Sequence, residues 1–344
     1  ARLDAMAKDY PAAMEELAQA GKLVEDQKHP DIKLISREKQ TIIPLPQIRL
    51  TEAESEHLRL EIQSEMQRVH GAAGIKIKPE ITMRSRQGEP GRQALFELRA
   101  PSRMEIPNPW GTLSLQITPI NISAGHLVLG VEPDTMPFGT VSGPIADRDI
   151  KAEGVAVGVG YEHRGWQLDL GVTPVNFARS TIVGGLSCKI AIRDITLTLE
   201  ASRRAVEESV LSFAGVTDPG TGHVWGRVVK QGGAVTLSHE GRNSKSYAIL
   251  DYKYLTGTNV KPNNSLAAHL GLRWELHRAR NMSLETGLAV SAMAFERNLS
   301  EFTFGHGGYF SPQRFVHGGL PIDWGGSYKA VAWRLTLEPG VTWL

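Results

Sequence analysis

The sequence predicts an all-β fold, an antiparallel transmembrane β-barrel of the outer-membrane type over residues 74–344, preceded by a short α-helical segment. Three observations support this prediction. Apolar and polar residues alternate one by one after Gly74, no run of 18 or more apolar residues occurs, and aromatic residues lie toward the ends of the alternating stretches. A tilted strand that crosses a bilayer needs about 9–11 residues and presents apolar side chains to lipid only at alternate positions, which produces this combination.

Residues 1–27 are predicted to be helical. Two explanations fit the spacing: the tail of a periplasmic helical repeat array, such as tetratricopeptide repeats, or an isolated amphipathic helix. Pro11 interrupts the pattern. The apolar residues that recur at three- and four-residue spacing are Leu3, Met6, Tyr10, Met14 and Leu17.

Residues 28–73 are predicted to be a linker that contains one helix. The first part has several prolines and no clear period. Thr51 and Glu54 then form a T-x-x-E capping box, which typically opens a helix. We expect Gly71 and Gly74 to stop that helix.

Residues 74–344 change to a period of two. The clearest stretch is Leu266 to Leu276, where apolar residues stand at every even position and Arg273 and Glu275 are among the residues between them. Eleven residues of unbroken alternation are enough to cross a bilayer. We expect about 12 to 14 strands. Similar alternation occurs at 75–84, 113–118, 155–161, 166–170, 284–294 and 331–338.

A soluble β-sandwich also alternates and is the competing prediction. The membrane barrel is favoured because several stretches exceed the usual soluble strand length of about five or six residues. Aromatic residues toward strand ends also suit the girdles at the two membrane interfaces. These residues are Tyr161, Trp166, Tyr252, Tyr254, Trp274 and Trp333.

The charge balance excludes some classes of function. Lys plus Arg number 38 and Asp plus Glu number 37. A nucleic-acid-binding surface needs a basic excess, so we expect no nucleic-acid partner. The one cysteine, Cys188, excludes an internal disulfide and is expected to be a small strand residue. The chain begins at Ala1 without an initiator Met, as expected after removal of a leader or for an excerpt of a longer protein.

No catalytic or metal-binding motif is present. The sequence has no H-E-x-x-H, G-x-S-x-G or Walker A segment, and its 11 histidines are dispersed. His306 lies in a glycine cluster and His239 is expected at a hairpin end. Gly158 and Gly160 fit small residues facing a lumen better than a dinucleotide fingerprint. We therefore expect no enzyme activity, no metal and no cofactor.

Several segments in the second half resemble one family. The longest runs from Asn298 to Gln313 and includes Gly307, Gly308, Tyr309, Phe310, Ser311, Pro312 and Gln313. The others are 209–215, 218–222, 225–229 and 255–260. Together they resemble the C-terminal domain of the cellulose synthase operon protein C (BcsC) family, over roughly residues 74–338.

The resemblance implies a fold, a location and partners. Members of the family have a periplasmic array of tetratricopeptide repeats followed by a barrel in the bacterial outer membrane. The barrel releases cellulose that is made by an inner-membrane synthase. The resemblance thus implies a cellulose chain, outer-membrane lipid and periplasmic synthase components as partners, and a monomeric barrel.

The alternation places a mixed set of polar side chains on the lumen side. In an exporter they would offer many weak hydrogen bonds to an uncharged glucan, and the alternative is that they pair with one another and only hold the barrel in shape. These lumen candidates are Arg84, Glu97, Arg99, Gln116, Asp169, Asp251, Lys253, His269, Arg273, Glu275, Arg334 and Glu338.

Three other functions remain open. A related exporter could carry another exopolysaccharide, although a charged polymer favours a lumen of one sign. A barrel enzyme acting on lipid would need a Ser/His pair at the rim, and a structural barrel would have a plugged lumen. The chain stops at Leu344 as a further strand begins, so we expect either a truncated barrel or closure with fewer strands.

Overall fold

The computed structural model describes residues 15–22, 52–108, 110–129, 137–142, 145–279, 281–329 and 331–344. The chain divides into two compact units. One comprises residues 1–77, 104–114 and 161–164, and the other comprises 78–103, 115–160 and 165–344. The predicted linker 28–50 and most of the predicted helical tail 1–27 lie outside the described residues.

The described helices of the first unit are residues 15–22 and α3, Glu52–Ala73. The helix α3 begins at Glu52, inside the T-x-x-E segment, whose Thr51 lies outside the described residues. Gly71 does not stop it, because the helix continues to Ala73 before Gly74. No helix in the described part of the chain is both long enough and apolar enough to cross a membrane.

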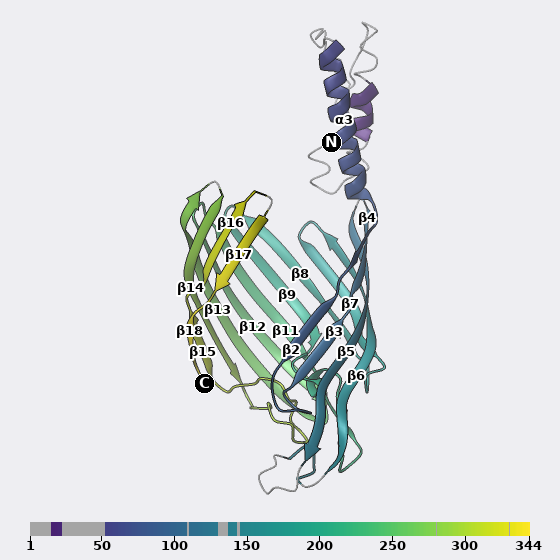
Figure 1. Ribbon diagram of the computed structural model, residues 1–344, viewed down its shortest axis with the longest axis vertical. Helices are drawn as coiled ribbons and strands as arrows, with labels where there is room; N and C mark the ends of the chain where they lie inside the picture. The colour runs from purple at the N-terminus through teal and green to yellow at the C-terminus, as the bar shows by residue number, and fades with distance from the viewer. Residues whose placement is uncertain are drawn as a thin grey trace. The chain divides into compact units, whose positions relative to one another are not determined.

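The second unit is built almost entirely of strands, and many of them are long (Figure 1). Strands β5, β6 and β13 reach 19, 19 and 20 residues. The strands are β1 (Lys76–Pro79), β2 (Thr82–Arg86), β3 (Leu95–Arg99), β4 (Ser102–Asn108), β5 (Gly111–Leu129), β6 (Ile145–His163), β7 (Trp166–Val175), β8 (Ile182–Ile192), β9 (Ile195–Ala205), β10 (Val216–Thr217), β11 (Val224–Glu240), β12 (Ser244–Thr258), β13 (Val260–Ala279), β14 (Met282–Phe295), β15 (Phe315–Gly319), β16 (Ile322–Tyr328), β17 (Val331–Leu337) and β18 (Gly340–Trp343).

Antiparallel pairing joins these strands into one wall. β2 pairs with β3, β3 with β5, and the order then follows the chain, with β9 paired to β11. β15 and β16 both pair with β14, and they pair in turn with β18 and β17. β3 and β4 likewise both lie beside β5, and they pair in turn with β2 and β1. Each of these four interrupted pairs, β1/β2, β3/β4, β15/β16 and β17/β18, forms a single strand path. Counting each once, and leaving out the two-residue β10, gives 13 paths in the described part of the chain.

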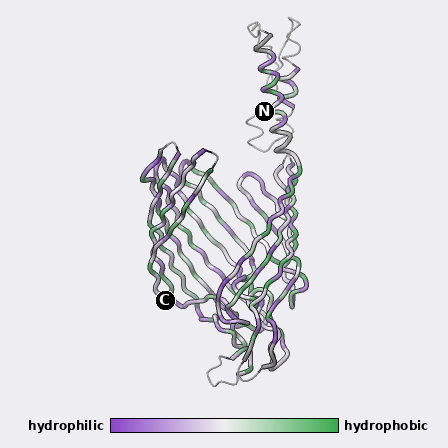
Figure 2. The backbone as a smooth tube through the Cα atoms, viewed as in Figure 1, coloured by the Kyte–Doolittle hydropathy of each residue, from purple (hydrophilic) through white to green (hydrophobic). Residues whose placement is uncertain are grey.

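Hydrophilic and hydrophobic residues alternate along the strands of the wall (Figure 2), which gives the wall an apolar face and a polar face. On β13 the even residues from Leu266 to Leu276 are apolar, and Leu266 and Leu270 are more than half exposed. The odd residues face the other side, where Asn263 contacts Tyr309. This second side is called the inner face. The alternation arises because successive side chains of a strand point to opposite sides. The fold is an outer-membrane β-barrel, as the sequence predicts.

The aromatic residues of the outer face cluster toward strand ends, as a girdle requires. Trp166 is the first residue of β7, and Tyr252 and Tyr254 lie near the end of β12. Trp324 and Trp333 meet edge to face at 4.9 Å on β16 and β17. Such rings suit the interface because one edge is polar and the rest is apolar.

Connections of two kinds alternate along the chain. Those after β4, β6, β8, β11, β13 and β16 have two or three residues, and this end of the wall is called the turn end. Those at the opposite end, the loop end, are 87–94, 130–144, 176–181, 206–223 and 296–314, with one tight turn at Asn259. Outer-membrane barrels show this asymmetry, with short turns on the periplasmic side and longer loops outside.

Candidate functional site

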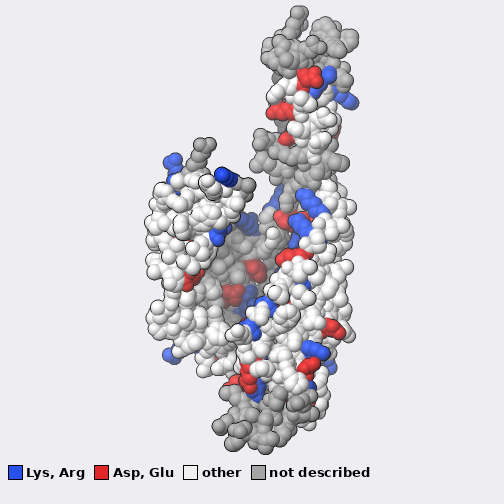
Figure 3. Space-filling model, viewed as in Figure 1, with Lys and Arg blue, Asp and Glu red and all other residues white. Residues whose placement is uncertain are grey.

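The predicted lumen residues lie at inner-face positions of their strands, except Glu338, which lies between β17 and β18. Register fixes this placement, because Arg273 on β13 aligns with inward residues of β14, and Asp251 on β12 aligns with Ala234 and Ala267. Figure 3 shows charged atoms in the hollow of the wall and mostly uncharged atoms on its outer surface. The inner face is thus polar and carries both signs of charge.

Most of the charges on the inner face are paired. Lys253 lies 3.0 Å from Asp251, and Arg204 Nη2 donates to Asp169 Oδ1 at 2.6 Å. Arg273 forms an ion pair with Asp323, reaching past β14. Further pairs and hydrogen bonds join Arg84 with Glu97, Arg278 with Glu275, His269 with Ser291, Gln116 with Thr118, and His317 with Glu338.

This pattern supports the alternative that many lumen charges hold the wall in shape. A paired charge presents little net field to a passing molecule, although its outer oxygens and N–H groups can still form hydrogen bonds. The inner face is therefore hydrogen-bonding and weakly polarised rather than strongly charged.

The loop end of the inner face is filled by three segments, which together are called the plug: residues 137–142, 206–223 and 296–314. Their apolar side chains are buried against the wall. Phe213 is 2% exposed, and Trp225 of β11, which packs against the plug, is 0% exposed. The core that they form includes Leu95, Ile120, Ile122, Leu127, Phe138, Ile150, Phe177, Val210, Leu211, Val216 and Phe302.

The plug contains one short helix, α4 (Val210–Phe213), and its sequence explains its start. Ser209 caps the helix, because its hydroxyl accepts from Ser212 N while the Ser212 hydroxyl accepts from Ser209 N. This reciprocal pair satisfies backbone groups that burial would otherwise leave without partners. The helix can therefore enter an apolar core.

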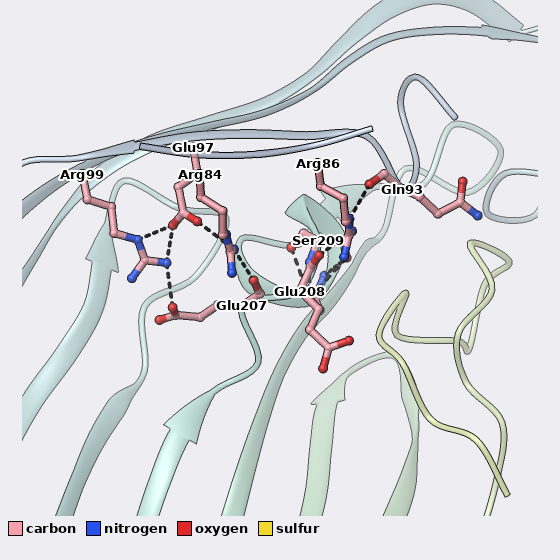
Figure 4. Close-up of polar contacts among 9 residues, drawn as sticks. Arg84, Arg86, Gln93, Glu97, Arg99, Glu207, Glu208 and Ser209 are labelled. Carbon is pink, nitrogen blue, oxygen red and sulfur yellow. Dashed lines mark hydrogen bonds and ion pairs between the residues drawn. The ribbon is translucent and has the colours of Figure 1, made fainter. Parts of the chain in front are cut away.

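Ion pairs and hydrogen bonds attach the plug to β2 and β3 (Figure 4). Arg99 Nη2 lies 2.6 Å from Glu207 Oε2. Arg84 donates to the carbonyl of Glu207, and Arg86 donates to the carbonyl of Glu208 at 2.7 Å. Three arginines of the wall thus converge on two consecutive plug residues.

Asp218 joins two segments of the plug. Its carboxylate accepts four hydrogen bonds, from the backbone N–H and hydroxyl groups of Thr140 and Thr221, at 2.6–2.8 Å. Burial alone would raise the pKa of Asp218, but these bonds outweigh it and lower the pKa to about 2. The charged form of Asp218 therefore fastens segment 137–142 to segment 206–223.

Glu208 and Tyr309 connect the remaining segment. Glu208 Oε2 accepts from Phe310 N at 2.5 Å. Burial raises the pKa of Glu208, although this bond and the nearby Lys230 and Arg86 oppose the rise. Tyr309 is buried, which raises its pKa to about 12, and its hydroxyl accepts from Asn263 Nδ2 at 3.1 Å.

The family-like loop thus has a structural role. Gly307, Gly308, Tyr309, Phe310, Ser311, Pro312 and Gln313 all lie in plug segment 296–314. Gly308 has φ 62° and its α-carbon faces Leu211 and Phe302, so a side chain would meet both backbone strain and the plug core. His306 is also structural here, since its carbonyl accepts from Trp225 Nε1 at 2.9 Å.

Several residues of the site were missed by the alternation pattern. Glu207, Glu208 and Asp218 lie between strands, so no period marks them. The only local signal is the S-x-x-S spacing at Ser209 and Ser212, which indicates a capped helix start. Within the described residues, no group of three or more His, Cys, Asp or Glu side chains could hold a metal ion.

A barrel wall with a polar inner face and a plug at its loop end defines the class: an outer-membrane β-barrel with a plugged lumen. The sequence matches the family described as "Cellulose synthase operon protein C C-terminus" over residues 93–344. The chain belongs to this family.

Curated relatives carry the same description. The chain is 33% identical over 266 residues to cellulose synthase operon protein C of Pseudomonas fluorescens, covering 76% of this chain and 20% of that protein. It is 38% identical over 191 residues to the protein of Xanthomonas axonopodis pv. citri, covering 55% and 13%. The chain therefore spans a fifth or less of the length of these relatives.

Solved structures similar to the wall are remote. OmpT, an outer membrane protein of Vibrio cholerae, aligns with a TM-score of 0.38 and 11% identity, over 78% of this chain and 85% of that one. A loop L8 deletion mutant of OmpT aligns with a TM-score of 0.39. These values are too low to support any functional conclusion.

Proposed function

We propose that this chain is the outer-membrane channel through which cellulose leaves the periplasm during bacterial cellulose biosynthesis. The observation that carries the proposal is the inner face, which is polar, of mixed sign and largely internally paired. Membership of the family supports cellulose as the exported polymer, because the relatives are named cellulose synthase operon protein C.

The chemistry of the inner face suits an uncharged polysaccharide. A glucan offers hydroxyl groups at its edges, which can exchange many weak hydrogen bonds with paired side chains such as Asp251 and Lys253. A charged exopolysaccharide would bind a lumen of one sign. The mixed sign of the paired charges favours the neutral polymer.

The connections suggest the orientation. In this proposal the turn end faces the periplasm and the loop end faces the exterior, as short turns and long loops do in outer-membrane barrels. The chain enters β1 at the turn end, so the residues before Lys76 are assigned to the periplasm. There they would meet the periplasmic components of the synthase, while the barrel works as a monomer.

The plug implies that the described state is closed at the loop end. Export requires the attachments of Glu207, Glu208 and Asp218 to give way, because the plug core occupies the lumen. No chemical step is proposed for the chain. The polymer would be driven by its synthesis at the inner membrane, and the barrel would supply only a path.

Deletion of the gene in a cellulose-producing strain tests the proposal. We expect glucan synthesis by isolated inner membranes to continue, while cellulose outside the cells disappears. The full-length wild-type gene should restore secretion. Normal secretion of cellulose by the deletion strain would reject the export role, and loss of a different exopolysaccharide would transfer the role to that polymer.

A further inference from the structure

Three arginines converge outside the plug at the loop end, and they are called the rim arginines: Arg179, Arg203 and Arg227. Arg203 Nε donates to the carbonyl of Ile182 at 3.2 Å. Arg227 Nη1 donates to the carbonyl of Ser180 at 3.0 Å. Arg203 therefore reaches the first residue of β8, and Arg227 reaches the connection 176–181 directly before it, which carries the exposed Arg179.

Register places Arg203 on the outer face. Arg203 aligns with Gln231 on β11, which aligns with Tyr254 on β12. That row continues the outward positions of Leu199 and Val235, which are 42% exposed each. Arg227 lies at an irregularity in the pairing of β11 with β12 and has φ 48°. Its guanidinium group donates to Thr258 Oγ1 at the end of β12 and to the carbonyl of Ser180, which places it at the loop-end edge of the wall.

Along the strands, the rim arginines lie at the depth where the loop end of the wall meets the membrane interface. Arg203 is in register with Tyr254, one of the girdle tyrosines, and lies beyond the apolar outer-face residues of β9. Arg227 and Arg179 are further toward the loop end. This is the depth at which lipid headgroups meet a barrel.

The rim arginines lack the acidic partners that arginines of the inner face have. In the part of the chain that the structure describes, Arg84, Arg99, Arg204 and Arg273 each form a salt bridge with a carboxylate. Arg203 instead bonds Gln231, Arg227 bonds Thr258 and Ser180, and none of the three rim arginines forms a salt bridge among the described residues.

Two further facts point to an absent anion. Arg227 Nε is buried and has no hydrogen-bond partner within the described protein. Three like charges gathered in a partly desolvated place repel one another, which is unfavourable unless a negative group joins them. Guanidinium groups match phosphate oxygens well, because their N–H donors lie in a planar fork.

We propose that the rim arginines form a binding site for the phosphate groups of the phosphorylated glycolipid of the outer leaflet, lipopolysaccharide. The site would fix a lipid headgroup against β8, β9 and β11, directly outside the plug segment 206–223. The proposal uses the orientation given above, with the loop end outward, but not the identity of the exported polymer.

The test measures lipid A binding by the full chain in detergent, by native mass spectrometry with bisphosphorylated lipid A and with the same lipid after dephosphorylation. The variants are R179Q, R203Q and the double variant. Arg179 makes no hydrogen bond or ion pair among the described residues, so R179Q leaves the fold intact. R242Q is the matched control, because Arg242 is an exposed arginine at the turn end beside β11.

We expect each rim variant to weaken binding of bisphosphorylated lipid A by about tenfold, the usual effect of losing a charge-assisted hydrogen bond. R242Q should bind as wild type does, and dephosphorylated lipid A should not distinguish the proteins. Wild-type affinity in the double variant would overturn the proposal. Binding of inorganic phosphate by the wild type as tightly as lipid A would also overturn it, since that result would indicate a site for free anions. Cellulose secretion is a separate assay, so failure of the lipid test leaves the export proposal standing.

Discussion

Arg99 on β3 and Glu207 in the plug form an ion pair, with 2.6 Å between Arg99 Nη2 and Glu207 Oε2. The two residues are separated by 108 positions in the chain. The wall and the plug are therefore fastened by a contact between side chains that are partly exposed to the lumen, and such a contact can be broken without unfolding the barrel.

Glu207→Gln should loosen the plug. The change removes the ion pair with Arg99 but leaves Arg99 paired with Glu97. A partly exposed pair contributes about 0–1 kcal/mol, so the barrel should unfold at nearly the wild-type temperature. Single-channel recordings in planar bilayers should show more frequent openings. Lys245→Gln, which breaks the Lys245–Glu285 pair away from the plug, is the control and should leave the openings unchanged.

Phe213→Ala should open the plug more strongly. The ring of Phe213 packs edge to face on Phe177 at 5.1 Å and lies under the guanidinium of Arg99. Removing a buried aromatic ring lowers stability by about 3–5 kcal/mol, and because Phe213 lies in the plug, the packing of the plug is what should be weakened. Hydrogen exchange should show that the amides of α4 exchange faster in Phe213→Ala than in the wild type. In the control Leu288→Ala, on the outer face, the amides of α4 should exchange at the wild-type rate. Unchanged protection of α4 in Phe213→Ala would show that the plug does not depend on this core.

Acid should release the plug through Asp218. The folded-state pKa of Asp218, about 2, lies below its ordinary value of 3.8. Its stabilising contribution, about 2 kcal/mol, is therefore present above pH 4 and is lost as the pH falls toward 2. Glu208 has the opposite sign, because its raised pKa makes its contribution largest at low pH.

Conductance recorded between pH 5 and pH 2 checks this. Wild-type openings should increase below pH 4. Asp218→Asn should already open at neutral pH and should lack the acid-dependent increase, since an amide cannot accept all four bonds from Thr140 and Thr221. An acid-dependent increase of wild-type size in Asp218→Asn would assign the effect to another group.

Asp323→Asn and Arg273→Gln should shift ion selectivity in opposite directions. The two side chains pair across the inner face, and Thr336 Oγ1 also donates to Asp323 at 2.7 Å. Asn at position 323 leaves Arg273 uncompensated and should favour anions, whereas Gln at position 273 should favour cations. Reversal potentials under a salt gradient measure both. Equal reversal potentials in the two variants would mean that this pair does not face the ion path.

The wall could be predicted from the sequence because the alternation of side chains along a strand is a local property. Leu266, His269 and Arg273 were assigned to their faces from the two-residue period alone, and the structure places them on those faces. The family resemblance identified segment 298–313 as distinctive without indicating what it does. Arg203 and Arg227 lie near ends of strands and Arg179 lies in a connection, where the alternation no longer separates lipid from solvent.

The sequence by itself determined the strand-rich fold, the polar inner face and the apolar outer face, because side-chain direction in a strand depends only on position along it. Only the tertiary structure decided that residues 206–223 and 296–314 pack against the loop end of the inner face and that Arg84, Arg86 and Arg99 hold segment 206–223 there. Those contacts join residues more than 100 positions apart, and they form only after the strands have paired. No local pattern encodes which carboxylate an arginine will meet.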